Sequence, residues 1–293
     1  MYKRQRKNCI KLNGKKCKPD THIAENDIIK LFIPDEMLIP KAKSDPDDFT
    51  GVSDKIDIVY EDENILLVDK PVGMVVHEDE SGDSDTLINR IKSYLYHKGE
   101  YHPENELSFA PALCNRIDRN TCGIVIAAKN AESLRILNQK IRDRELTKLY
   151  LCIACGKVTP DSATLTAYLE KNSDTNTVKI SDKKTKSNLT IKTKYKVIAY
   201  NGENSLLKVD LLTGRTHQIR AHLAYIGHAL LGDGKYGNNK LNKKYGFKYQ
   251  ALCSYELQFK FTTDAGCLSY LDGKCFKAKA PDFVKMFGSN IKL

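Results

Sequence analysis

The chain has 293 residues, of which 41% are hydrophobic, so it is long enough to bury the core of one large domain and a small appendage. Its formal net charge of +10 favours a polyanionic partner, with nucleic acid ahead of an anionic membrane, over a strongly acidic small substrate. The sequence has no apolar run of the roughly 18 residues that a membrane span needs and no apolar core of a signal peptide, so we expect a cytoplasmic protein.

The first expected element is a basic hairpin within residues 1–41. Eight lysines and arginines precede the first acidic residue, Asp20. Apolar and polar residues alternate on both sides of Asn13-Gly14, a dipeptide that favours a tight turn. We therefore predict two short strands joined by this turn, with a plain solvated terminus as the alternative. Residues 42–54 lose this periodicity and collect proline, glycine, serine and aspartate, which predicts a linker to a main domain at 55–293.

The main domain shows strand and helix patterns in turn. Two strand-like runs fill 55–71, and a helix follows at 85–99 with Asp85 as its expected cap. The remaining expected segments are strands at 123–129, 148–156, 162–170, 177–180, 188–200 and 205–212, and helices at 131–144 and between Gly214 and Gly227. Hairpins with inserted helices favour an α+β fold, with a mixed, largely antiparallel sheet and flanking helices, over a regular βαβ repeat.

Patterns typical of cofactor and metal sites are missing. The sequence has no GxxxxGK[ST] loop, and GDGKYG at 232–237 lacks the strand-to-helix context of a dinucleotide site. Cys152 and Cys155 form a CxxC pair inside an expected strand, where their side chains would point to opposite faces. No second pair is present to complete a zinc site, and the odd count of nine cysteines favours reduced thiols. We therefore expect neither a metal nor a cofactor.

An aspartate in the run NRIDRNTCG, residues 115–123, is the first candidate for chemistry. Asp118 stands between Arg116 and Arg119 just before an expected buried strand, and a nearby cation favours the ionised carboxylate. Such a group is a credible nucleophile or base. From this local context alone, a structural salt bridge is the better interpretation.

Two further segments gather polar residues. Residues 211–223, LLTGRTHQIRAHL, place arginine, histidine and glutamine in one turn-to-helix stretch that we expect to become helical near Thr216. The spacing of His217, His222 and His228 does not match a helical zinc site, so a structural role is favoured for each. Residues 69–77, DKPVGMVVH, form a strand end and a turn, and we interpret them as a packed loop.

Together, DKPVGMVVH, NRIDRNTCGIVIAAK, KLYLCIACG and LLTGRTHQIRAHLAYIGHALLGDGKYG resemble the successive motifs of RluA-type pseudouridine synthases, in the family's order over most of residues 57–260. The resemblance implies the pseudouridine synthase fold and an enzyme that isomerises uridine in structured RNA without cofactor or metal. By position, Asp118 matches the essential aspartate and Arg220 the basic residue that pairs with it. Tyr150 matches the tyrosine that stacks on the target base, and Arg116 the arginine that supports the flipped-out nucleotide.

The chain departs from the family pattern in two places and at its N-terminus. Asn115 and Cys122 stand where the family often has histidine and serine, and neither change removes the carboxylate. The N-terminal hairpin resembles the second half of an S4-like (alpha-L) RNA-binding module whose first two helices are short or missing here. Among RluA-type synthases, the appended module and long loops favour large-subunit ribosomal RNA as the substrate, with tRNA as the alternative. We also expect a monomer.

Two other classes of protein remain open. The first is a non-catalytic RNA-binding or ribosome-assembly protein on the same fold, and the second is a metal-dependent hydrolase. Joint retention of Asp118, Tyr150 and Arg220 favours the synthase, because a binding protein needs charge and stacking but no paired carboxylate. No spacing of ligands supports the hydrolase.

Overall fold

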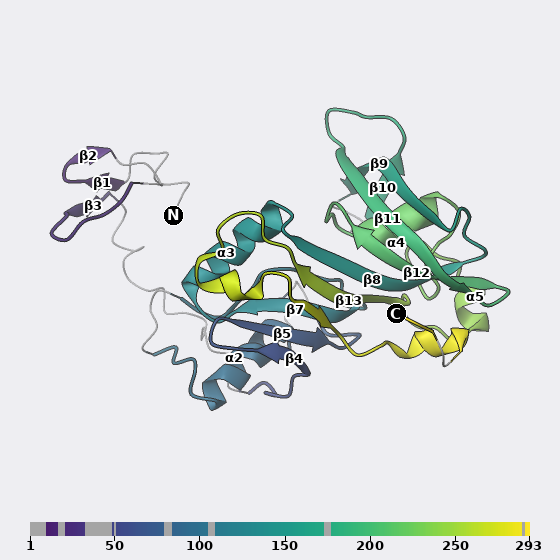
Figure 1. Cartoon of the computed structure of the whole chain (residues 1–293), viewed down its shortest axis with the longest axis horizontal. Helices are drawn as coiled ribbons and strands as arrows, with labels where there is room; N and C mark the ends of the chain where they lie inside the picture. The colour runs from purple at the N-terminus through teal and green to yellow at the C-terminus, as the bar shows by residue number, and fades with distance from the viewer. Residues whose placement is uncertain are drawn as a thin grey trace. The chain divides into compact units, whose positions relative to one another are not determined.

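The chain folds into two compact units. The computed structural model describes residues 10–16, 21–32, 49, 51–78, 84–104, 109–172, 177–288 and 291–293. The units are Met1–Asp48 and Phe49–Leu293 (Figure 1). Most of the linker expected at 42–54 lies outside the described residues.

The first unit contains a small antiparallel sheet. Strand β1 (Ile10–Leu12) pairs with β2 (Lys15–Lys16) across Asn13-Gly14, whose φ angles of 48° and 77° suit the tight turn that the sequence predicts. The hairpin is confirmed, but the sequence did not reveal β3 (Ile29–Leu31), which pairs with the other edge of β1. Asn13 connects the hairpin turn to the segment just before β3. Its side chain donates to Asp27 Oδ1 at 2.7 Å and accepts from the backbone N–H of Ile28 at 2.8 Å. These strands alone do not confirm the S4-like resemblance.

The second unit is built on one large sheet. Its path, within the described residues, is β10-β9-β11-β12-β8-β13-β7-β5-β4, with β14 paired to β13 and β6 to β7. All neighbours are antiparallel except β13 and β7, so the predicted mixed, largely antiparallel sheet is confirmed. The strands are β4 (Ile58–Glu61), β5 (Ile65–Lys70), β6 (Ala112–Leu113), β7 (Cys122–Ala128), β8 (Leu146–Cys155), β9 (Ser162–Asn172), β10 (Thr177–Ser181), β11 (Leu189–Tyr200), β12 (Asn204–Leu211), β13 (Leu252–Phe259) and β14 (Cys275–Lys277).

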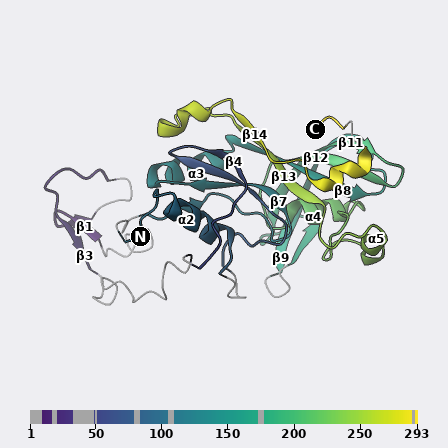
Figure 2. The same cartoon turned by 90° about the horizontal axis from the view of Figure 1, so that it is seen from below.

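Helices cover both faces of this sheet (Figures 1 and 2). They are α2 (Leu87–His97), α3 (Ala131–Arg142), α4 (Gln218–Tyr225), α5 (Asn239–Lys244) and the 3-10 helices η2 (Gly266–Leu271) and η3 (Asp282–Phe287). The expected cap of α2 was wrong: Thr86 accepts the N–H of Asn89, and Asp85 instead binds Arg90 at 2.6 Å. Helix α4 begins two residues later than expected, because His217 takes a left-handed conformation with φ 51°.

Burial on both faces explains the continuous apolar run of β5. Ile65 and Leu67 pack in a cluster with α3, whereas Leu66 and Val68 pack in another with α2. A strand covered on both sides reads as a continuous apolar run rather than an alternation.

The parallel pairing of β13 and β7 is very close at Gly123. Gly123 has φ 105°, and a Cβ placed on it would lie 2.2 Å from the carbonyl oxygen of Ser254. A side chain there would therefore push the strands apart. Since Gly123 ends the run NRIDRNTCG, this approach fixes where the loop that carries Asp118 enters the sheet.

Candidate active site

The loop between β6 and β7 carries Asp118 and is held by its own polar groups. The backbone N–H of Thr121 donates to the Asp118 carbonyl at 3.0 Å, which closes a turn around the aspartate. The side chain of Asn115 accepts the N–H of Ile126 on β7 at 2.8 Å. This is the position where RluA-type synthases often have histidine. The loop is thereby tied to β7 before the aspartate and closed into a turn after it.

A buried lysine anchors the same loop from β5. The Lys70 side chain is fully buried, and its ammonium donates to the carbonyls of Pro71 and Met74 at 2.8 Å and of Arg119 at 2.9 Å. The N–H of Gly73 also donates to the Arg119 carbonyl, at 3.0 Å. Burial lowers the pKa of Lys70 to about 8, an effect that the nearby Cys122 and Asp118 oppose. The segment DKPVGMVVH is thus the expected packed loop, and it also holds the residue next to Asp118.

Arg220 on α4 binds two carboxylates at once. Its Nη1 donates to Asp118 Oδ2 at 2.7 Å, while Nε and Nη2 donate to Asp233 Oδ2 and Oδ1 at 2.7 and 2.9 Å. The Asp118 side chain is 28% exposed, against 6% for Arg220 and 0% for Asp233. The bidentate pair with Asp233 fixes the guanidinium plane, and Asp118 is the carboxylate that remains open to solvent.

Asp233 belongs to the site although the sequence did not reveal it. Its Oδ1 also accepts the backbone N–H groups of Lys235 and Tyr236 at 2.8 and 3.1 Å. Burial would raise the pKa of Asp233, but the hydrogen bonds from Arg220 and from these backbone groups hold it below its usual value. The available signal was an acidic residue inside the glycine-rich turn GDGKYG, a segment that we considered only as a nucleotide loop.

His217 approaches Asp118 from the start of α4. Its Nε2 lies 3.8 Å from Asp118 Oδ2, and its Nδ1 is hydrogen-bonded to the Tyr236 hydroxyl at 2.9 Å. The Tyr236 oxygen accepts the N–H of Val178, so we assign its proton to the bond with Nδ1 and the ring proton to Nε2, which faces Asp118. Burial lowers the pKa of His217, as does the charge of Arg220, while Asp118 raises it. Burial and the charge of Arg220 thus favour the neutral form of the ring.

Tyr150 on β8 lies within electrostatic reach of Asp118. Burial raises the pKa of the Tyr150 hydroxyl to about 12, a hydrogen bond with Ser254 opposes this rise, and the charge of Asp118 adds to it. The side chain is 6% exposed and packs in a cluster with Ile219 of α4. Ile117, directly before Asp118, packs against the same cluster.

The structure therefore brings Asp118, Arg220 and Tyr150 to one place. Arg116 is on the same loop but is exposed, and its charge acts on His77, whose pKa is lowered first by burial and then by Arg116. The ion pair of Asp118 that the neighbouring positions of Arg116 and Arg119 indicated is formed by Arg220 of α4.

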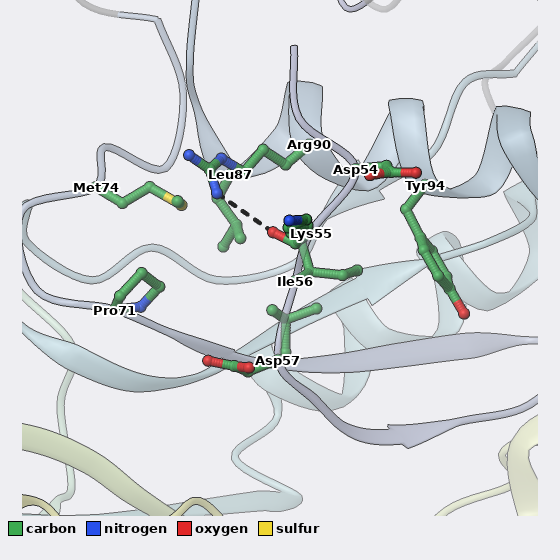
Figure 3. A pocket seen from close by; sticks show the side chains of 10 residues that line it. Asp54, Lys55, Ile56, Asp57, Pro71, Met74, Leu87, Arg90 and Tyr94 are labelled. Carbon is green, nitrogen blue, oxygen red and sulfur yellow. Dashed lines mark hydrogen bonds between the residues drawn. The ribbon is translucent and has the colours of Figure 1, made fainter.

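A separate hollow of about 500 Å³ lies between α2 and residues 54–57 (Figure 3). Pro71 and Met74 line it, and Arg90 donates across it to the Lys55 carbonyl at 3.3 Å. Asp118, Tyr150 and Arg220 do not line this hollow, so it is distinct from the candidate site.

The part of the chain that the structure describes holds neither a cluster of metal ligands nor a helix that could span a membrane. Within the described ranges, no three or more histidine, cysteine, aspartate or glutamate side chains gather as a metal site would require. In the same part of the chain, no helix has the length and apolar character that crossing a bilayer requires.

Comparisons with known proteins agree on one family. Residues 64–225 match the RNA pseudouridylate synthases. The chain is 38% identical, over 71% of its length and 64% of the relative's, to an uncharacterised RNA pseudouridine synthase of Mycoplasma genitalium. It is 33% identical, over 71% of its length and 63% of the relative's, to the ribosomal large subunit pseudouridine synthase D of Borreliella burgdorferi. The chain thus spans just under two thirds of these relatives.

Solved structures are similar in fold. The human RNA pseudouridylate synthase domain containing 1 has a TM-score of 0.60 at 21% identity, covering 78% of this chain and 84% of that one. The human RNA pseudouridylate synthase domain containing 4 has a TM-score of 0.61 at 18% identity, covering 78% and 90%. At these identities the likeness shows a shared fold.

Proposed function

The chain belongs to the family of RNA pseudouridylate synthases, and on this basis we propose that it isomerises uridine to pseudouridine in large-subunit ribosomal RNA. The observation that carries the proposal is the ion pair of 2.7 Å between Arg220 and the partly exposed Asp118. The ribosomal substrate is supported by the name of the Borreliella burgdorferi relative.

The reaction is an isomerisation that the side chains of this site can perform. The bond from N1 of uracil to C1′ of ribose breaks, the base turns, C5 bonds to C1′, and the C5 proton is lost as N1 gains one. Asp118 is the reacting group, either by attack at C1′ or by removal of the C2′ proton. Arg220 holds Oδ2 of Asp118, so we assign the reaction to Oδ1.

The target nucleotide has to leave its stack to reach Asp118. A paired or stacked uridine cannot be reached, and RNA-modifying enzymes flip such a base into a pocket. Tyr150 provides an aromatic ring beside Asp118, and Arg116 is exposed on the same loop, where its guanidinium supports the opened RNA. Because Tyr150 is only 6% exposed, a base that stacks on it must displace a side chain of the cluster in which it packs.

The Asp118→Asn variant tests the catalytic assignment. We expect it to lose tritium release from RNA labelled at uridine C5 while retaining RNA affinity, because affinity depends mainly on contacts to phosphate. Asp282→Asn is the matched control, since Asp282 is exposed and paired with Lys285, and it should release tritium like the unmodified chain. Undiminished release by Asp118→Asn would sink the assignment.

The substrate requires a separate experiment. Pseudouridines are mapped in ribosomal RNA and tRNA from cells with and without the gene. Loss of a site in large-subunit ribosomal RNA supports the substrate proposed above. A loss confined to tRNA would overturn the ribosomal substrate and leave the isomerase activity standing.

A further inference from the structure

The two faces of the sheet around β11 differ in what covers them. Tyr195 of β11, Val209 of β12 and Tyr150 of β8 are cross-strand partners, and they pack together with Ile219 of α4 on the face of the candidate site. Side chains alternate along a strand, so their neighbours on β11 point to the opposite face. Three lysines are exposed on that opposite face, and we call them the β11 lysine stripe: Lys192, Lys194 and Lys196.

Hydroxyl groups border the β11 lysine stripe on one side. The cross-strand partners of the three lysines on β9 are Thr166, Thr164 and Ser162, whose side chains are exposed. Small hydroxyls beside ammonium groups are the donors that contact phosphate oxygens in nucleic-acid complexes.

One carboxylate and one further lysine border the stripe on its other side. On β12, Lys194 lies opposite Asp210 and Lys196 lies opposite Lys208. Lys208 is already paired with Glu256 at 2.8 Å, and Asp210 is also within electrostatic reach of Lys260. The stripe therefore keeps a surplus of positive charge, which complements a polyanion.

The β11 lysine stripe is a row rather than a cluster. Alternate residues on a strand are about 6.8 Å apart, so the row from Lys192 to Lys196 is about 14 Å long. A row of cations can follow several phosphates of one RNA strand, whereas a cluster would contact a single phosphate.

One end of the stripe is joined to the candidate site. The N–H of Lys192 donates to Thr213 Oγ1 at 2.8 Å, and the Lys192 carbonyl accepts from Gln218 Nε2 at 3.0 Å. Gln218 lies two residues before Arg220 on α4, and Arg215 is exposed in the turn between Thr213 and Gln218. The turn that contains Arg215 is therefore hydrogen-bonded to the backbone of β11 at Lys192, the first lysine of the stripe.

We propose that the β11 lysine stripe is a second contact surface for the phosphate backbone of the substrate RNA, on the face of the sheet opposite Asp118. The inference rests on the proposed function only in naming RNA as the polyanion. RNA next to the target uridine passes over the turn that contains Arg215 and continues along β11. The stripe contributes affinity for long, structured RNA and leaves the chemical step to Asp118.

The test removes three charges from the stripe in the full chain. The variant is Lys192→Gln, Lys194→Gln and Lys196→Gln, and its matched control is Arg135→Gln, Arg142→Gln and Lys274→Gln. The control cations are exposed on α3 and just after η2, at the other end of the sheet from β11 (Figures 1 and 2). Filter binding from 50 to 200 mM salt then compares a large-subunit ribosomal RNA transcript with a short stem-loop cut from it.

We expect the stripe variant to lose up to about 100-fold in affinity for the transcript at 0.1 M salt, with a salt slope smaller by about 2, from three phosphate contacts at about 0.7 each. Affinity for the stem-loop and the rate of tritium release at saturating RNA should not change. A Lys→Arg triple should bind like the unmodified chain. If the glutamine triple lowers the unfolding temperature, a Lys→Thr triple, which suits a strand, takes its place.

Equal losses in the stripe and control variants, or an unchanged salt slope, would overturn the proposal. Loss of binding to vesicles with anionic lipid, with RNA affinity intact, would also overturn it and mark a membrane surface. A chain that binds the transcript through the stripe but releases no tritium would contradict the proposed function and leave this inference standing.

Discussion

Asp233→Asn is the most direct test of how Arg220 is held. Asp233 is fully buried and binds the guanidinium through two hydrogen bonds of 2.7 and 2.9 Å. Asparagine keeps one oxygen for the N–H groups of Lys235 and Tyr236, but its NH₂ group would face the Nε–H donor of Arg220. The change therefore leaves a buried cation with Asp118 as its remaining charged partner.

Removing one partner of a buried ion pair costs about 3 to 5 kcal/mol, because the other charge stays buried without compensation. Asp118 compensates part of this loss, so we expect a loss of about 3 kcal/mol in the free energy of unfolding. With an m value of about 3 kcal/mol per molar urea, the midpoint falls by about 1 M. The rate of tritium release should fall too, since a guanidinium released from Asp233 no longer fixes Asp118 Oδ2.

Urea unfolding and tritium release are measured on the same preparations. Asp282→Asn again serves as the control, because Asp282 and Lys285 form a fully exposed pair, and its midpoint should stay with the unmodified chain. The pKa of Asp233 in the folded chain lies below its usual value. Ionised Asp233 therefore stabilises the fold fully at pH values above the pKa that this carboxyl has in the unfolded chain. This stabilisation is lost as the pH falls through the lower pKa of the folded chain. If Asp233→Asn unfolded at the original midpoint and kept its rate, Asp233 would not be what positions Arg220.

Two other changes test the surroundings of the site. Lys70→Met removes the ammonium that donates to the carbonyls of Pro71, Met74 and Arg119. Each buried carbonyl left without a donor costs about 1 to 3 kcal/mol, so the free energy of unfolding should fall by about 3 kcal/mol or more. An unchanged urea midpoint would refute this. Burial lowers the pKa of His222 to about 4, so the unfolded chain binds the proton first as pH falls. When the pH falls from 7 to 4.5, the free energy of unfolding of the unmodified chain should decrease by about 2 kcal/mol more than that of His222→Asn. Equal shifts of the urea midpoint in the two proteins between these pH values would contradict this.

Elements with a clear local period were predictable from the sequence, whereas β13 was not. The alternation of β11 and the apolar run of β7 gave both strands, and the apolar spacing of α3 gave that helix. Strand β13, which separates β8 from β7, contains the buried polar residues Ser254 and Glu256 and is covered on both faces. These polar residues interrupt both the alternation and the apolar run by which a strand is recognised in a sequence. They can be buried because partners far along the chain, such as Lys208 for Glu256, satisfy them.

The candidate site was reached through the resemblance rather than through local pattern. Asp118 has arginines on either side in the sequence, yet the cation that binds it lies 102 positions away on α4. Asp233 escaped notice for the same reason, since its partner Arg220 is 13 positions away and their contact exists only in the folded chain. A pattern of neighbours predicts elements, and it does not report which charges meet.

The salt-bridge interpretation of Asp118 and the catalytic one are compatible in the folded chain. Two independent anchors hold the residue: Lys70 fixes the main chain at Arg119, and Arg220 fixes the carboxylate through Oδ2. A structural pair would bury both partners, as Arg220 and Asp233 do, but Asp118 stays 28% exposed. Asp233 is therefore the carboxylate that is buried to fix Arg220, while the carboxylate of Asp118 is oriented and stays accessible to a nucleotide. The proposed isomerisation requires such an accessible, oriented carboxylate.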